Sequence, residues 1–199
     1  MKLNFRRVAI FLLLLAISVG FGFGFDAVAT VMEKNRYPIR EEFADQIRAC
    51  SEEFGVPEAI IWATVCVESG FVSDAVGKDG GIGLMQLTPK DMEMIQTDIL
   101  GEEPQHKGFL YYPQANLRCG TAYLSWLYQR YGVWETVFAA YSAGYGTVDA
   151  WLKDPELITP QGTLSSIPDA EARDFVSDAT EAFEAYTKLY FESNAKNKS

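Results

Sequence analysis

A single carboxylate closes an apolar segment that should be buried in the fold. Residues 59–67 contain one polar side chain and are followed directly by Glu68. Gly70, a residue that commonly ends helices, comes two positions later. A carboxyl group in the last turn of a buried helix loses hydration, and the negative end of the helix dipole also disfavours its charged form. Both effects would raise the pKa of Glu68, so that it could hold a proton near neutral pH and act as a general acid. From residue type and position alone, a solvent-facing glutamate at a helix end is the commoner arrangement.

Other catalytic arrangements have weaker support. The one histidine, His106, lies in a polar stretch and no Cys-x-x-C motif occurs, which argues against both a zinc site and a Ser-His-Asp triad. The glycine-rich stretch 73–83 lacks the spacing of a phosphate-binding loop, and its Asp74 and Asp79 are typical of solvated turn residues. We therefore expect no cofactor and no metal.

Composition and charge limit the class of protein. The 199 residues, 48% of them hydrophobic, suffice for one domain with a real core, and we expect a monomer. The formal net charge of −10 argues against nucleic acid as a partner, because a phosphate-binding surface needs clustered Lys and Arg. Of the three cysteines, Cys50 and Cys66 fall in apolar patterns, and we expect small buried hydrophobes rather than a disulfide framework.

The N-terminus has the pattern of an export signal. Basic residues precede the uncharged segment 8–25, whose 18 residues are at the lower edge of membrane-span length. Two interpretations stay open for residues 1–29. They form either an uncleaved signal anchor, which we slightly prefer, or a signal peptide cleaved after Ala29 in a small-x-small sequence. Either one places the rest of the chain outside the cytoplasm, anchored in the membrane or secreted.

The elements that must position Glu68 are helices, because strand-like alternation is absent and apolar residues recur at helical spacing. Helices are predicted over 39–54, 57–69, 117–131 and 134–144, with a short helix capped by Thr88 and a closing helix after Pro168. Residues 98–114 are predicted to form a loop. The expected fold class is all-α, with 30–38 as a linker, 39–190 as the domain and 191–199 as a polar tail.

Five motifs occur in a defined order along the chain. They are ESGF at 68–71, GIGLMQLTP at 81–89, NLRCGTAYL at 116–124, AAYSAG at 139–144 and IPDAEARDFV at 167–176. Together they resemble the catalytic domain of the soluble lytic transglycosylases, which are related to goose-type lysozyme. The resemblance covers roughly residues 39–190 and implies a lysozyme-like helical domain of the SLT type preceded by an N-terminal hydrophobic helix. The basic and apolar N-terminus also resembles membrane-anchored members from Gram-positive bacteria.

The resemblance implies an enzyme that cleaves peptidoglycan glycan strands. It would break the β-1,4 bond between N-acetylmuramic acid and N-acetylglucosamine and form a 1,6-anhydro product. Glu68, the glutamate of the ESGF motif, would act first as the acid and then as the base. Glycosidases usually need two carboxylates, but an internal hydroxyl nucleophile removes the need for the second.

The resemblance also assigns substrate binding to five side chains: Ser69, Gln86, Tyr141, Ser142 and Glu171. Ser69 would support Glu68 or the reacting sugar, Gln86 would hydrogen-bond to sugar, and the Tyr141 hydroxyl would orient Glu68. Each has a structural alternative, respectively a helix cap, a buried amide and a core aromatic. Glu171 would line the groove or be a solvated first-turn glutamate.

Two positions depart from the family pattern. Ser142 stands where the family usually has asparagine, and Phe175 stands where it usually has tyrosine. These changes bear on the positioning of substrate rather than on the reaction class. Two other hypotheses therefore stay open: a lysozyme-like hydrolase of the same bond, and a non-catalytic glycan-binding wall protein. We expect Met85 to pack in the core, Asn116 to cap its helix, and Glu68 to titrate above the ordinary value of about 4.3.

Overall fold

The computed structural model describes residues 28–192, and the chain divides into two compact units, Met1–Pro38 and Ile39–Ser199. In the first unit, residues 28–36 are helical, so the expected linker 30–38 is helical over most of its length. The apolar segment 8–25, predicted as a hydrophobic helix, lies outside the described residues, as does most of the predicted polar tail. None of the helices within residues 28–192 is long and apolar enough to cross a membrane.

The second unit is built from helices, as predicted. They are α2 (Glu41–Phe54), α3 (Glu58–Ser69), α4 (Pro89–Met94), α5 (Pro113–Tyr131), α6 (Trp134–Ala143), α7 (Tyr145–Trp151) and α8 (Ala170–Tyr186). Short π-helical segments follow α4 (Ile95–Ile99) and α8 (Thr187–Phe191), and a 3-10 turn (Lys107–Tyr111) precedes α5. Over residues 28–192 the only β-type pairs are isolated bridges.

The helix ends that position the site follow local signals in the sequence. Gly70 ends α3 in the left-handed conformation, with φ at 56°, and its N–H donates to the carbonyl of Cys66. Thr88 and Asp91 form a reciprocal capping box at the start of α4. Because these interactions span only three or four residues, the sequence predicts them well.

Two local predictions were wrong. Residues 98–114 are not a continuous loop, because the 3-10 turn lies within them and Pro113 starts α5 four residues before Leu117. Proline at the first helical position fits this start, since its missing N–H needs no partner there. The second error is that α7 was not predicted. Only Val148 is buried in this seven-residue helix, and one buried residue gives no apolar spacing from which a helix could be predicted.

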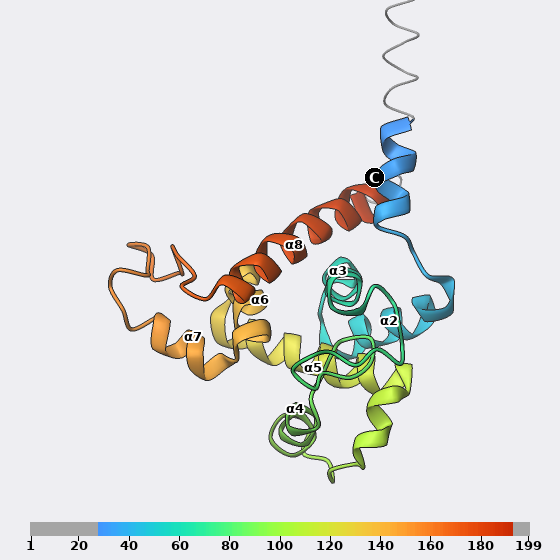
Figure 1. The fold of residues 1–199 in the computed structure, drawn as a ribbon, viewed down its shortest axis with the longest axis horizontal. Coiled ribbons are helices and arrows are strands. Elements are labelled where there is room, and N and C mark those ends of the chain that lie inside the picture. Colours follow the sequence, from blue (N-terminus) through green and yellow to red (C-terminus); the bar gives the residue numbers. More distant parts are fainter. Residues whose placement is uncertain (1–27, 193–199) are drawn as a thin grey trace, which may run out of the picture. The chain divides into compact units, whose positions relative to one another are not determined.

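α3 lies at the centre of the domain, with α8 running across it and across α6 (Figure 1). The side chains of residues 59–65 on α3 are all buried, which explains why the helix is apolar on every face. Trp62 of α3 packs with its ring centroid 6.1 Å from Tyr186 of α8 and 5.8 Å from Phe71. This packing holds the C-terminal end of α3, and with it Glu68, in a defined position.

Two of the cysteines behave as buried hydrophobes. Cys50 on α2 and Cys119 on α5 are buried free thiols, as expected for Cys50, while Cys66 is half-buried. Burial raises the pKa of the Cys50 and Cys119 thiols to about 11. Both groups therefore remain protonated and chemically inert at neutral pH.

Candidate active site

Glu68 lines a cleft with a volume of about 520 Å³. The cleft is formed by the end of α3, the stretch 77–91, the end of α6 and the start of α8. Four of the five predicted substrate-binding side chains line it with Glu68: Gln86, Tyr141, Ser142 and Glu171. The structure thus brings together motifs that are up to about a hundred residues apart in the chain.

Glu68 has the electrostatic character of a proton donor. Its side chain is half-buried, and burial together with the negative charge of Glu171 raises its pKa to about 8. The direction agrees with the expectation from the sequence, since burial is the larger cause. Among residues 28–192, no side chain or backbone group forms a hydrogen bond with the Glu68 carboxyl, which lines the cleft.

The raised pKa of Glu68 predicts a pH-dependent stability. Between its ordinary value of 4.5 and about 8, the folded protein holds a proton that the unfolded chain has released. The free energy of unfolding therefore falls as pH rises through this window, by an amount on the order of 4 kcal/mol. Glu68→Gln has no ionisable group at this position. Its free energy of unfolding relative to wild type should therefore rise by a similar amount as the pH increases from 4.5 to about 8. Urea unfolding of both proteins at several pH values measures the difference, and parallel profiles would contradict the raised pKa.

The Ser69 side chain forms hydrogen bonds to the backbone and does not face the cleft. Its hydroxyl donates to the carbonyl oxygen of Leu84 at 2.8 Å and lies 3.3 Å from that of Val65. The residue is not among those that line the cleft. The Ser69 hydroxyl therefore joins the end of α3 to the segment that carries Leu84.

Gln86 shapes the loop in which it lies. Its backbone has a φ of 48°, a left-handed conformation that few non-glycine residues adopt. Its side-chain nitrogen donates to the carbonyl oxygens of Gly83 at 2.8 Å and Ala75 at 3.3 Å. Its Oε1 lies close to Gly77, where an added Cβ would come within 2.5 Å. Since both amide protons are used within the loop, only the oxygen of the Gln86 amide remains for a ligand.

Asn116 is the residue whose role the sequence interpretation missed. It is fully buried on α5, where its Oδ1 accepts from the backbone N–H of Met85 at 2.8 Å. Its Nδ2 donates to the carbonyl oxygens of Ile82 at 2.8 Å and Leu110 at 2.9 Å. Asn116 was expected to cap its helix, and that prediction is wrong. It instead fixes the loop that carries Gln86. Met85 itself is fully buried, as predicted.

Tyr141 also attaches to this loop. Its hydroxyl donates to the carbonyl oxygen of Met85 at 2.8 Å rather than to Glu68, and its ring stacks on that of Phe175 with centroids 6.2 Å apart. Burial, assisted by the charge of Glu68, raises the pKa of the Tyr141 hydroxyl well above its ordinary value. Tyr141 therefore stays protonated and forms part of the wall beside Glu68. Phe175 needs no hydroxyl for this packing.

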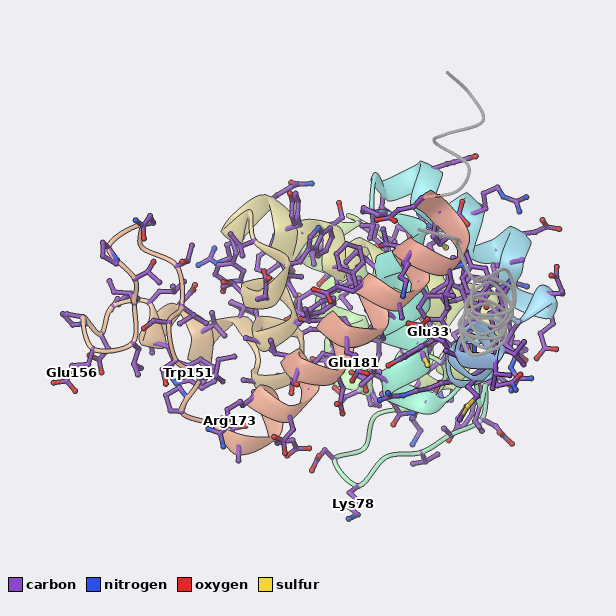
Figure 2. All side chains as sticks on the ribbon, turned by 90° about the horizontal axis from the view of Figure 1, so that it is seen from above. Glu33, Lys78, Trp151, Glu156, Arg173 and Glu181 are labelled. Carbon is purple, nitrogen blue, oxygen red and sulfur yellow. The ribbon has the colours of Figure 1, made fainter. Side chains whose placement is uncertain are left out.

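Four other residues that line the cleft are polar and exposed. Ser142 and Glu171 are exposed at the ends of α6 and α8 that face the cleft. Lys78 and Asp79 line it from the loop that follows α3, and Lys78 projects from that loop into solvent (Figure 2). Asp79 is exposed, as predicted, but its place in the cleft was not expected; Asp74 does not line it. No sequence signal separates these two aspartates.

Sequence comparison identifies a family and several relatives of this chain. The family described as Transglycosylase SLT domain matches residues 45–157. The membrane-bound lytic murein transglycosylase C of Edwardsiella ictaluri is 31% identical over 119 residues, which cover 54% of this chain and 32% of that protein. The soluble lytic murein transglycosylase of Escherichia coli K12 is 28% identical over 160 residues, 79% of this chain and 24% of that protein.

Solved structures share the helical architecture. The 70-kDa soluble lytic transglycosylase of Escherichia coli superposes with a TM-score of 0.71 at 25% identity, covering 80% of this chain and 26% of that one. An inactive glutamate-to-glutamine mutant of the lytic transglycosylase Slt from Pseudomonas aeruginosa gives 0.67 at 29% identity, covering 78% and 25%. The chain thus spans about a quarter to a third of the length of these relatives. Since the family match extends over more than half of its residues, the chain belongs to the transglycosylase SLT domain family.

Proposed function

We propose that this protein is a lytic murein transglycosylase that cleaves peptidoglycan with Glu68 as its catalytic residue. The observation that carries the proposal is the position of Glu68, in a cleft and with a pKa raised to about 8. The family membership and the names of the relatives support the reaction class. A carboxyl group that is protonated at neutral pH is what cleavage of a glycosidic bond requires.

In the proposed reaction Glu68 acts twice, first as a general acid and then as a general base. Glu68 donates its proton to the glycosidic oxygen as the bond from C1 of N-acetylmuramic acid to O4 of N-acetylglucosamine breaks. The resulting Glu68 carboxylate then takes the proton of the muramic C6 hydroxyl, whose oxygen attacks C1. The products are a 1,6-anhydro-muramic end and a free 4-hydroxyl, no water is consumed, and Glu68 is protonated again.

The rest of the cleft positions the glycan strand for this reaction. Ser142 and Glu171 are exposed polar groups along it, and the half-buried Gln86 contributes its amide oxygen. Tyr141 and Ser69 hold the wall and the loop beside Glu68 through bonds to the backbone at Met85 and Leu84. We assign the first three to substrate binding and the last two to positioning of the site.

A hydrolase is the second candidate, because Glu171 places another carboxylate in the same cleft. In that case a water molecule activated by Glu171 would replace the C6 hydroxyl as nucleophile, giving a reducing end. A non-catalytic glycan-binding protein, suggested by Ser142 and Phe175, would bind without cleavage.

The test is mass spectrometry of the products released from purified peptidoglycan, with Glu68→Gln as control. We expect 1,6-anhydro-muropeptides from the wild-type protein and none from the variant. Reducing-end products alone would establish the hydrolase, and binding without release of products would establish the non-catalytic protein. Either result would overturn the proposed reaction.

We further propose that the domain works outside the cytoplasm, where peptidoglycan lies. One relative is named as membrane-bound and the other as soluble, so both modes occur among the proteins that this chain resembles. Residues 8–25 would anchor the protein, or cleavage after Ala29 would release it. Detecting the protein in the membrane or the medium with an antibody to its C-terminal domain would separate the two.

A further inference from the structure

A second pocket, separate from the catalytic cleft, lies at the start of α6. Its volume is about 570 Å³, and none of the residues that line it also lines the cleft. Residues 163–167 form part of its wall, and Arg173 reaches it from the first turn of α8 (Figure 2). The start of α6 contributes Val133, Glu135 and Thr136. The proposed cleavage of peptidoglycan uses none of these groups.

Thr136 brings an unused hydroxyl to this pocket. The residue is only 4% exposed, yet its hydroxyl forms no hydrogen bond with any group of residues 28–192. By contrast, the buried hydroxyl of Thr64 donates to the carbonyl oxygen of Ile60 one turn earlier in its helix. The Thr136 oxygen keeps some accessible surface, and at a residue this buried that surface faces the pocket. A polar group in such a place normally has a partner, so the hydroxyl points to a ligand.

The start of α6 adds backbone donors. No side chain caps the helix at Val133, and the N–H groups of residues 134–136 have no hydrogen-bond partner among residues 28–192. Unpaired N–H groups and the positive end of the dipole of this ten-residue helix favour a bound anion. The Thr136 hydroxyl belongs to the same first turn, so both kinds of donor serve one ligand.

Arg173 supplies a positive charge. Its Nη1 donates to the carbonyl oxygen of Ile167 at 3.1 Å, which ties the guanidinium to the wall of the pocket. Within residues 28–192 it forms no ion pair with a carboxylate. Its remaining N–H groups suit the oxygens of a phosphate. The exposed side chains of Ser165 and Ser166 add two hydroxyl donors.

Glu135 limits which anion can bind. Its exposed carboxylate lines the pocket together with a single cationic side chain, Arg173, so the net charge of the lining is close to zero. Charge alone therefore attracts no anion, and a ligand must accept several directed hydrogen bonds. A phosphoryl group does so through its oxygens. The volume of the pocket also leaves room for an organic part beside Leu164 and Ile167.

We propose that this pocket binds a phosphoryl group, held by the first N–H groups of α6, the Thr136 hydroxyl and the Arg173 guanidinium. The site goes beyond the proposed function, because its ligand needs no glycosidic bond and does not enter the cleft. Inorganic phosphate and an organic phosphate ester share this chemistry, and the test separates them.

The test is a phosphorus NMR titration of the full-length protein with inorganic phosphate and with glycerol 3-phosphate. We expect saturable binding, which Thr136→Val should weaken about threefold to tenfold through the loss of one hydrogen bond. Arg173→Gln should weaken it about tenfold, and Glu135→Gln, which removes the opposing charge, should strengthen it. Arg48→Gln is the matched control, because it removes an exposed positive charge on α2 that does not line the pocket.

Urea unfolding separates a ligand contact from a structural role. Thr136→Val should leave the free energy of unfolding unchanged, because its hydroxyl has no partner in the protein. Thr64→Val should lower it and leave phosphate binding unchanged.

Tighter binding of glycerol 3-phosphate would identify an ester as the ligand, and equal affinities would identify free phosphate. The site is overturned if neither probe binds saturably up to about 10 mM, or if Thr136→Val and Arg173→Gln leave the affinity unchanged. A failure of the protein to cleave peptidoglycan would bear only on the proposed function.

Discussion

Replacement of Glu68 by glutamine is expected to lower the rate of peptidoglycan cleavage by about 10²- to 10⁴-fold, the usual contribution of a general acid. Glutamine keeps the size and the hydrogen-bonding edge of the glutamic acid, but it has no proton to give and cannot become a base. The structure records no hydrogen bond from the carboxyl to a described residue, so the substitution removes chemistry without breaking a structural contact. Release of soluble muropeptides over time measures the rate.

The control for this prediction is Glu171→Gln in the same cleft. The charge of Glu171 contributes to the raised pKa of Glu68, so its removal should lower that pKa and shift the alkaline limb of the pH–rate profile toward lower pH. The variant should keep measurable activity. Retention of cleavage within tenfold of wild type by Glu68→Gln would remove Glu68 from the mechanism.

The second large effect is expected from Asn116→Ala, which should lower the free energy of unfolding by about 3–5 kcal/mol. Truncation leaves the N–H of Met85 and the carbonyls of Ile82 and Leu110 without their partner in a fully buried site. Each buried polar group that loses its partner costs about 1–3 kcal/mol. Urea unfolding followed by far-UV circular dichroism measures the change.

Thr64→Val is the matched control for Asn116→Ala. Thr64 is equally buried, but its hydroxyl donates only to the carbonyl of Ile60 one turn earlier in α3. Its loss should cost about 1 kcal/mol, and it should leave activity near wild type. Asn116→Ala should reduce activity as well, because the loop that it holds carries Gln86. Similar costs for both variants would show that Asn116 does not organise the loop.

The sequence was sufficient for the features that depend on near neighbours. The apolar run before Glu68, the glycine that ends α3 and the cap at Thr88 all act within about four residues, and each predicts what the structure shows. The central position of α3 follows from the same run, because the helix is apolar on every face. That run alone left a solvent-facing Glu68 open, and the motifs elsewhere in the chain favoured the acid role. The seven-residue α7 escaped prediction since it is too short to show a periodicity.

Only the tertiary structure decided what the other polar side chains do. The backbone between residues 82 and 85 receives bonds from Ser69, Asn116 and Tyr141, whose partners lie 15 to 56 residues away in the chain. Hydroxyl and amide groups of the same type bind sugar in one protein and backbone in another, so residue type alone could not separate substrate contacts from loop supports. The choice depends on which carbonyl and N–H groups the packed helices leave without partners. The local pattern placed Glu68 at the end of a buried helix, because the run before it is apolar. The packing of α3, α5 and α6 against one loop determined the cleft that it faces.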